Sequence, residues 1–187
     1  ILEPVRALGE QGYAVTFVSV DEYGRVDPDD VFRALQKDTL LVAVMYANNE
    51  IGTIEPIAEI GKEIKRFKKE NRILANDPPY FFTDACQAAG YLSLDVEKLG
   101  VDLLALNASK IYGPKGVGAL WARKGISLAS IILGGGQERG LRSGTENVPG
   151  IVGLARALEI ADAEREKESA RVRALRDYFF GELKKNF

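Results

Sequence analysis

The chain has 187 residues, of which 46% are hydrophobic and 28% are charged, a composition typical of globular proteins that excludes a disordered or collagen-like chain. Its formal net charge is −2, and acidic and basic residues are interspersed, so it lacks the basic patch of a nucleic-acid-binding protein. The longest apolar run, residues 40–47, is far shorter than a bilayer span requires.

The first half of the chain predicts alternating helices and strands. A helix that ends near Gly12 precedes residues 13–20, which are rich in β-branched and aromatic side chains, as expected for a strand. Asp27 is expected to cap a short helix that follows it. Residues 39–47 are apolar on both faces, which is typical of a strand covered on both sides. Apolar residues then recur at helical spacing over residues 57–71.

The second half continues the same alternation. Strands are predicted at residues 80–85, 101–108 and 118–123, and a long helix is predicted from Asn147 onward. Because strands that alternate with helices form right-handed crossovers, we expect an α/β fold with a doubly wound, mostly parallel sheet and helices on both faces. The chain begins without an initiator Met or a signal-peptide pattern, so we interpret it as a fragment of a longer protein.

Polar side chains follow three of the predicted strands, at the edge where open parallel sheets bind ligands. They are Asn48 and Asn49, then Asp84 and Gln87, and then Asn107, Ser109 and Lys110. The sequence contains no histidine, so the commonest general base and zinc ligand is absent and no metal site is expected. An acid and a lysine on neighbouring strand ends instead indicate a pyridoxal phosphate site, in which the lysine forms a Schiff base and the acid pairs with the pyridinium nitrogen.

Plainer interpretations of the same residues remain open. Asp84 could simply cap a helix that starts at Ala85, and Lys110 could be a solvated lysine at the start of a loop. Lys115 is the rival amine, but its place between Pro114 and Gly116 indicates an exposed turn.

A single cysteine and a glycine-rich segment are two further candidates for functional groups. The single cysteine, Cys86, favours a reducing, cytoplasmic compartment, and we expect it to be a small buried hydrophobe rather than a nucleophile. The glycine-rich residues 134–140 lack the strand-then-helix context of a dinucleotide-binding loop. We expect them to form a flexible interface loop.

Four motifs in register carry a family resemblance. They read NNEIGTIEPIAEIG, TDACQAAG, SKIYGPKGVGAL and GGGQERGLRSGTENVPGIVG. In this order and spacing they resemble the NifS/IscS-type cysteine desulfurases of the class V aminotransferase group, which are fold type I pyridoxal phosphate enzymes. The resemblance extends over nearly the whole chain. It implies that residues 1–150 are the cofactor-binding large domain without its N-terminal part, and that residues 151–187 are a helix leading toward a missing C-terminal small domain.

The resemblance also implies roles for individual residues. Lys110 matches the Schiff-base lysine and Asp84 the partner of the pyridine nitrogen, while Asn49 and Gln87 match neighbours of the cofactor's phenolic oxygen. Thr145 matches a threonine that reaches the phosphate of the neighbouring subunit's cofactor, which implies a homodimer. The family usually has Ser and His at the phosphate-contacting positions before the lysine, whereas this chain has Asn107 and Ser109, and both can still donate hydrogen bonds.

The implied reaction converts L-cysteine to L-alanine and passes persulfide sulfur to an acceptor protein for iron–sulfur cluster or thiolation pathways. The family's catalytic cysteine and its substrate-binding arginine would lie downstream of this chain, so the fragment alone is expected to be inactive. The alternatives are another class V enzyme, such as a selenocysteine lyase or an aminotransferase, and a catalytically silent scaffold.

Overall fold

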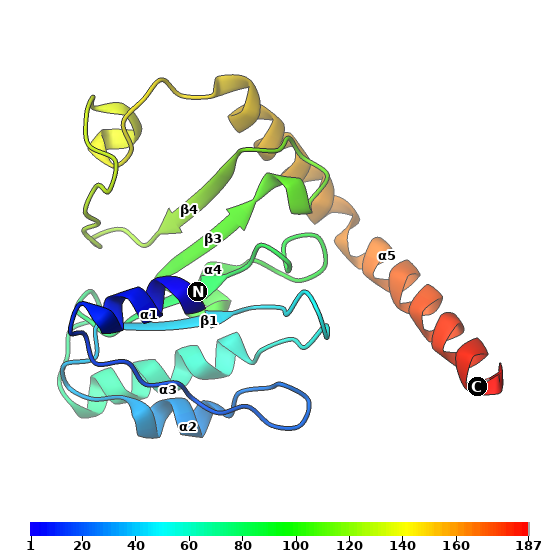
Figure 1. The fold of residues 1–187 in the computed structure, drawn as a ribbon, viewed down its shortest axis with the longest axis horizontal. Coiled ribbons are helices and arrows are strands. Elements are labelled where there is room, and N and C mark those ends of the chain that lie inside the picture. The colour runs from blue at the N-terminus through cyan, green and yellow to red at the C-terminus, as the bar shows by residue number, and fades with distance from the viewer. Residues whose placement is uncertain (187) are drawn as a thin grey trace.

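Four strands form one mixed sheet in the computed structural model, which describes residues 1–186 (Figure 1). The strands are β1 (Leu41–Met45), β2 (Tyr80–Asp84), β3 (Leu103–Asn107) and β4 (Gly118–Ala122), and they lie in that order in the sheet. β1, β2 and β3 are parallel, and β4 is antiparallel to β3. The predicted α/β fold with a mostly parallel sheet is confirmed.

Helices fill the connections between the strands. They are α1 (Leu2–Glu10), α2 (Pro28–Ala34), α3 (Ile57–Glu70), α4 (Val96–Leu99) and α5 (Val148–Asn186), with short 3-10 helices η1 (Ala108–Lys110) and η2 (Gln137–Gly140). The predicted cap of α2 is confirmed, because the Asp27 carboxylate accepts a hydrogen bond from the Asp29 backbone N–H at 2.9 Å. α1 ends just before Gly12, as the sequence predicts.

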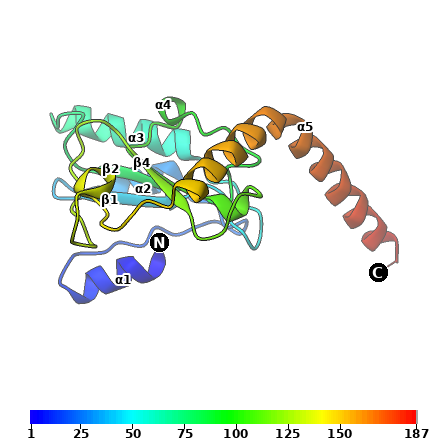
Figure 2. The ribbon, with the colours of Figure 1, turned by 90° about the horizontal axis from the view of Figure 1, so that it is seen from above.

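The principal core lies between the sheet and α3. Ile57, Ile60, Ile64 and Phe67 of α3 are all buried and pack in one cluster with Phe81 of β2. α2 packs beside α3, and α1 lies on the opposite side of the sheet from α3 and α4 (Figure 2). Coverage of the two faces is unequal, because Leu41 and Leu120, which point to the face away from α3, are about half exposed.

The prediction of a strand at residues 13–20 is wrong. This segment is extended, but it joins no strand of the sheet and makes only an isolated bridge between Val20 and Val26. Tyr13 and Phe17 are exposed. Strand propensity favours an extended backbone, but a strand also requires a neighbour that completes the hydrogen-bond ladder.

The predicted long helix is confirmed as α5, which has 39 residues. Only its first turns are buried in the body of the chain, through Gly150 and Leu154. The C-terminal half extends away from the sheet (Figure 1). None of the helices within residues 1–186, α5 included, is both long and apolar enough to cross a membrane.

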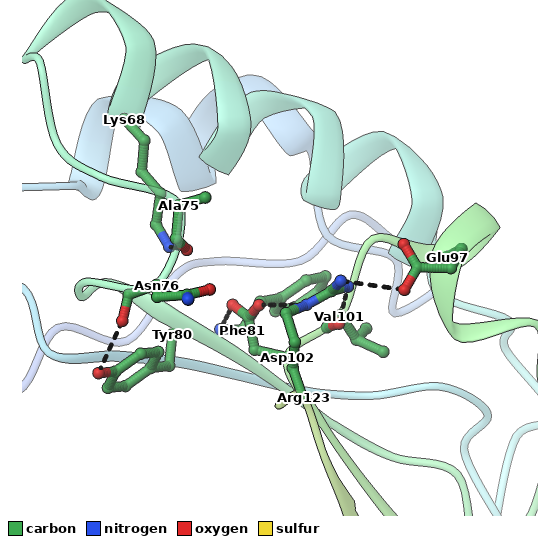
Figure 3. Close-up of polar contacts among 9 residues, drawn as sticks. All are labelled: Lys68, Ala75, Asn76, Tyr80, Phe81, Glu97, Val101, Asp102 and Arg123. Atoms are coloured by element: carbon green, nitrogen blue, oxygen red, sulfur yellow. Dashed lines mark hydrogen bonds and ion pairs between the residues drawn. The ribbon is translucent and has the colours of Figure 1, made fainter. Parts of the chain in front are cut away.

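Asp102 joins three strands at the amino end of the parallel sheet (Figure 3). Its carboxylate accepts hydrogen bonds from the Phe81 backbone N–H at 2.9 Å and from Nε of Arg123 at 3.1 Å. Its own backbone N–H donates to the Phe81 carbonyl, and its carbonyl accepts from the Arg123 N–H, both at 2.8 Å. The Arg123 guanidinium also donates to the Val101 carbonyl at 2.8 Å and pairs with Glu97 at 3.0 Å. These contacts set the registers of β2, β3 and β4 relative to one another.

Lys68 of α3 lies near this network. Its Nζ donates to the Ala75 carbonyl at 3.1 Å, which ties α3 to the segment that leads into β2. Burial lowers the pKa of Lys68, and the nearby carboxylates of Asp102 and Asp77 oppose that shift. The amino end of the sheet is therefore a polar but well-paired region.

We predict that Asp102→Ala destabilises the protein by about 3 kcal/mol, because it leaves a partly buried guanidinium and a backbone N–H without their partner. The matched control is Glu97→Ala on the exposed side of the same arginine, where a loss of less than about 1 kcal/mol is expected. The measurement is the urea midpoint of unfolding of each variant. Equal effects of the two substitutions would contradict the role of Asp102 in joining the three strands.

Candidate active site

Asp84 ends β2 in the middle of the sheet, opposite Met45 of β1 and Ala105 of β3. Its side chain is partly buried, and Oδ1 accepts a hydrogen bond from the Cys86 backbone N–H at 3.0 Å. The prediction of a helix starting at Ala85 is wrong, because this segment forms successive turns. So short a segment gains too few helical hydrogen bonds to offset helix nucleation, and Asp84 nevertheless caps the first turn.

Lys110 is the last residue of η1, which follows β3 directly. Asn107 shapes this turn, since its Oδ1 accepts hydrogen bonds from the Ser109 backbone N–H at 2.9 Å and from the Ser109 hydroxyl at 2.8 Å. The side-chain NH2 of Asn107 is therefore the group left to donate to a ligand, whereas the Ser109 hydroxyl proton is already used. Lys110 is exposed, and its amine forms no hydrogen bond or ion pair with any other residue of the described chain.

The Cys86 thiol lies within electrostatic reach of both Asp84 and Lys110. Burial raises the pKa of this thiol from 9.0 to about 12, the Asp84 carboxylate adds to the rise, and the positive charge of Lys110 opposes it. β2 and β3 are adjacent and parallel, Asp84 ends β2, and Lys110 lies in the turn directly after β3, so the acid and the amine lie at the same edge of the sheet. The two groups that the sequence predicts for one site thus lie at a common sheet edge, and their joint role in one site stays a prediction. The raised pKa makes Cys86 a poor nucleophile, because the thiolate is disfavoured.

The two asparagines after β1 have different environments. Asn48 Oδ1 accepts hydrogen bonds from the backbone N–H groups of Glu50 and Ile51, at 2.8 and 3.1 Å, and so closes the turn. Asn49 is exposed, and its side chain has no hydrogen bond within residues 1–186. Asn49 is therefore the one of the pair that is free to meet a ligand. Gln87 is partly buried beside the Asp84 turn.

α5 holds the loop that carries Lys110 at close range. Ala108 and Ile111 are buried in one cluster with Leu154 of α5. A Cβ atom on Gly153 of α5 would lie 2.9 Å from Cγ of Pro114, which is too close for an ordinary contact. The sequence suggested no role for Gly153, because the contact joins segments that are far apart in the chain.

A cavity of about 360 Å³ opens between this loop and α5. Its lining comes from the turn after β2, from η1 and its loop, and from α5: Gly90, Tyr91, Lys110, Ile111, Tyr112, Ala157, Ile160, Ala161, Glu164 and Glu168. Tyr112 has a φ of +61°, in the left-handed region that disfavours a bulky side chain. Such a conformation persists where the neighbouring structure fixes the backbone, and the next residue, Gly113, donates its N–H to the Ala108 carbonyl at 2.9 Å on the loop that carries Lys110.

Thr145 is not brought to this edge by an element of the sheet. It lies in the exposed connection between β4 and α5, and no hydrogen bond joins it to the other predicted site residues within the described chain. η2, in the same connection, lies toward the amino ends of β1, β2 and β3, at the opposite end of the sheet from their carboxyl ends (Figure 1). No group of three or more His, Cys, Asp or Glu side chains gathers within residues 1–186 in a way that could hold a metal ion.

The comparisons with known proteins agree on one family. The family described as Aminotransferase class-V matches residues 1–186. The chain is 49% identical over 185 residues to "Cysteine desulfurase IscS" of Dictyoglomus turgidum, which covers 99% of this chain and 44% of that protein. It is 48% identical over 177 residues to "Cysteine desulfurase IscS 1" of Archaeoglobus fulgidus, which covers 95% of this chain and 44% of that protein.

Solved structures give the same picture. A "NifS-like protein" superposes with a TM-score of 0.89 and 41% identity, over 98% of this chain and 48% of that one. "SspA in complex with cysteine" superposes with a TM-score of 0.74 and 38% identity, over 84% of this chain and 43% of that one. The chain spans less than half the length of the curated relatives that it matches.

We predict that Gly153→Ala weakens the protein although alanine favours a helix by about 1 kcal/mol over glycine, because the new methyl group would collide with the rigid ring of Pro114. Gly181→Ala is the matched control in the same helix, since a Cβ there meets nothing within 4 Å. Thermal unfolding should show a lower midpoint for Gly153→Ala and an unchanged or higher one for Gly181→Ala. A higher unfolding midpoint in both variants would show that Gly153 does not approach Pro114 closely.

We predict that the native fold protects Cys86 from alkylation. At pH 9.0 a thiol with a pKa of about 12 is ionised in about one molecule in a thousand, whereas at least about half of an unfolded thiol is ionised, so iodoacetamide should modify native Cys86 about 500 times more slowly than the urea-unfolded chain. Burial is the main cause of the raised pKa and the Asp84 carboxylate adds to it, so Asp84→Asn should speed the reaction, by less than unfolding does. Mass spectrometry of the Cys86 peptide measures both rates, and equal rates in native and unfolded protein would contradict the prediction.

Proposed function

Because the chain belongs to the class V aminotransferase family, we propose that it is the cofactor-binding part of a pyridoxal-phosphate-dependent cysteine desulfurase. The observation that carries the proposal is the shared sheet edge of Asp84, which ends β2, and Lys110, which lies in the turn after the neighbouring parallel strand β3. The names of the relatives support the reaction class. The similar structure of SspA is a complex with cysteine, which supports L-cysteine as the substrate.

The residues present fit pyridoxal phosphate. A partly buried carboxylate, an exposed amine without a partner and a free asparagine amide end three neighbouring elements of one sheet edge. When bound, the cofactor would supply an electron sink for the bond-breaking chemistry at the substrate. These groups match what the cofactor requires: a carboxylate to accept a hydrogen bond from its ring nitrogen and an amine for its aldehyde.

Each side chain would have a separate task. Asp84 would keep the ring nitrogen protonated, while Asn49 and Gln87 would donate hydrogen bonds to the phenolic oxygen. The Asn107 amide NH2 would face the phosphate, and Ser109 would join it only by releasing its hydrogen bond to Asn107. Lys110 would hold the cofactor and move a proton at the α-carbon of the substrate, since its amine is committed to no other group in the described chain.

For the whole protein, the proposed reaction converts L-cysteine and an enzyme thiol to L-alanine and an enzyme persulfide, whose outer sulfur then passes to an acceptor protein. The thiol would come from outside this chain, because Cys86 is the single cysteine here and is disfavoured as a thiolate. Supply of sulfur for iron–sulfur clusters is in keeping with the IscS names of the relatives.

The proposed assembly is a homodimer of two-domain subunits in the cytoplasm. Residues 1–150 would form the cofactor-binding domain, and residues 151–187 would lead toward a second domain. The connection that carries Thr145 is rich in exposed apolar side chains, with Ile131 at 94% and Leu133 at 81% exposure. Such a surface fits contact with a second subunit, and Thr145 would then reach the partner's phosphate. The single cysteine fits a reducing compartment.

We predict that Lys110→Ala abolishes the visible absorption band of the full-length protein loaded with pyridoxal phosphate, and with it the release of alanine from L-cysteine. Lys115→Ala, on the exposed turn of the same loop, should retain both. Borohydride reduction of the wild-type protein should bleach the band and add the mass of the reduced cofactor to the peptide that contains Lys110. A band that survives in Lys110→Ala, or a label on another lysine, would overturn the assignment.

A further inference from the structure

We infer that Glu55 is a positioning residue for the candidate site: its buried carboxylate ties the loop that carries Asn49 to the hairpin of residues 20–26. The inference rests on the proposed function only in assigning Asn49 to the cofactor. The hydrogen bonds between the loop and the hairpin lie within this chain, and none of them involves a residue predicted to bind the cofactor.

The Asn49 loop is a tight turn that follows β1 and has a narrow base. Ala47 pairs with Ile54 in an antiparallel bridge. The Asn48 N–H donates to the Thr53 carbonyl at 2.9 Å, and the Gly52 N–H donates to the Asn48 carbonyl at 3.2 Å. Asn49 therefore lies at the exposed end of a loop whose direction depends on how its base is held.

Glu55 lies at that base. Its backbone N–H donates to the Tyr46 carbonyl at 3.0 Å, while its side chain turns inward and is only 7% exposed. Oε2 accepts a hydrogen bond from the Val26 N–H at 2.9 Å. No salt bridge to Glu55 forms within the part of the chain that the structure describes. A buried carboxylate without a cation costs free energy, so its presence favours a geometric role.

Two further contacts join the same loop and hairpin. The Thr53 hydroxyl donates to the Tyr23 carbonyl at 2.5 Å. Gly24 has a φ of +74°, which favours glycine, and a Cβ atom there would lie 2.7 Å from Cδ1 of Ile51, so the hairpin and the loop approach each other closely at this point.

The hairpin is itself firmly held, so it can act as a fixed support. Asp21 Oδ1 accepts hydrogen bonds from the N–H groups of Tyr23 and Arg25, at 2.9 and 2.8 Å. Val26, which ends the hairpin, is buried in the main core together with Val31 of α2. Loss of the Glu55 acceptor would leave the Val26 N–H unpaired and remove the buried tie between the base of the Asn49 loop and this support.

The test compares Glu55→Gln, which keeps an acceptor oxygen, with Glu55→Met, which has a similar length and no acceptor, in the full-length protein. We expect Glu55→Met to weaken pyridoxal phosphate binding about tenfold, to shift the pH profile of the visible band, and to speed amide hydrogen exchange over residues 47–54 of the cofactor-free protein. Glu55→Gln should keep the affinity, the pH profile and the exchange rate at their wild-type values. Glu50→Gln, on the exposed part of the same loop, is the control and should change none of them.

The outcomes separate the possibilities. Unchanged hydrogen exchange in Glu55→Met would show that Glu55 does not hold the Asn49 loop. Faster exchange with an unchanged pH profile of the visible band would show that Glu55 stabilises the loop without positioning the site, and would overturn the inference. If Glu55→Met does not fold, Thr53→Val removes the second contact alone and should show the same three changes. A wild-type protein that binds no pyridoxal phosphate would overturn the proposed function, while the exchange comparison would still decide whether Glu55 holds the loop.

Discussion

The double pairing of Asp102 with Phe81 and Arg123 is the constraint on which the rest of the structure depends. The backbone and side chain of this one residue bind both neighbouring strands at the amino end of β3. A shift by one residue would turn every side chain of a strand to the other face. The same contacts therefore decide which residues lie at the carboxyl ends of the strands. With the registers fixed in this way, β2 ends in Asp84 and β3 ends in the turn that carries Lys110.

At the carboxyl end the candidate site is built from short connections, each held by a different contact. Asn107 caps the turn before Lys110, and α5 packs on that turn through Leu154 and Gly153. Glu55 joins the base of the Asn49 loop to the Val26 N–H. Groups that must meet one ligand gain from being held in place before it arrives. The sheet therefore brings the side chains together, and the loop contacts orient them.

Exposed apolar side chains are concentrated where this chain has few contacts of its own. Ile131 and Leu133 lie in the connection before α5, and Tyr178 and Phe179 lie on the far half of α5. Leu120 is exposed on the sheet face away from α3. These surfaces suit the proposed second subunit and second domain, because large apolar patches usually mark contacts with other protein surfaces. They also agree with a chain that spans less than half of its relatives.

The sequence by itself determined the fold class, the helices at Asp27 and after Asn147, and the polar residues that end the strands, because local periodicity and capping are written in neighbouring residues. The tertiary structure alone decided that residues 13–20 do not pair as a strand and that Asn48 closes a turn while Asn49 stays free. It also decided that Glu55 reaches Val26 and that Gly153 meets Pro114. These outcomes depend on hydrogen-bond partners and close approaches between segments that are distant in the chain, and no local pattern records such distances.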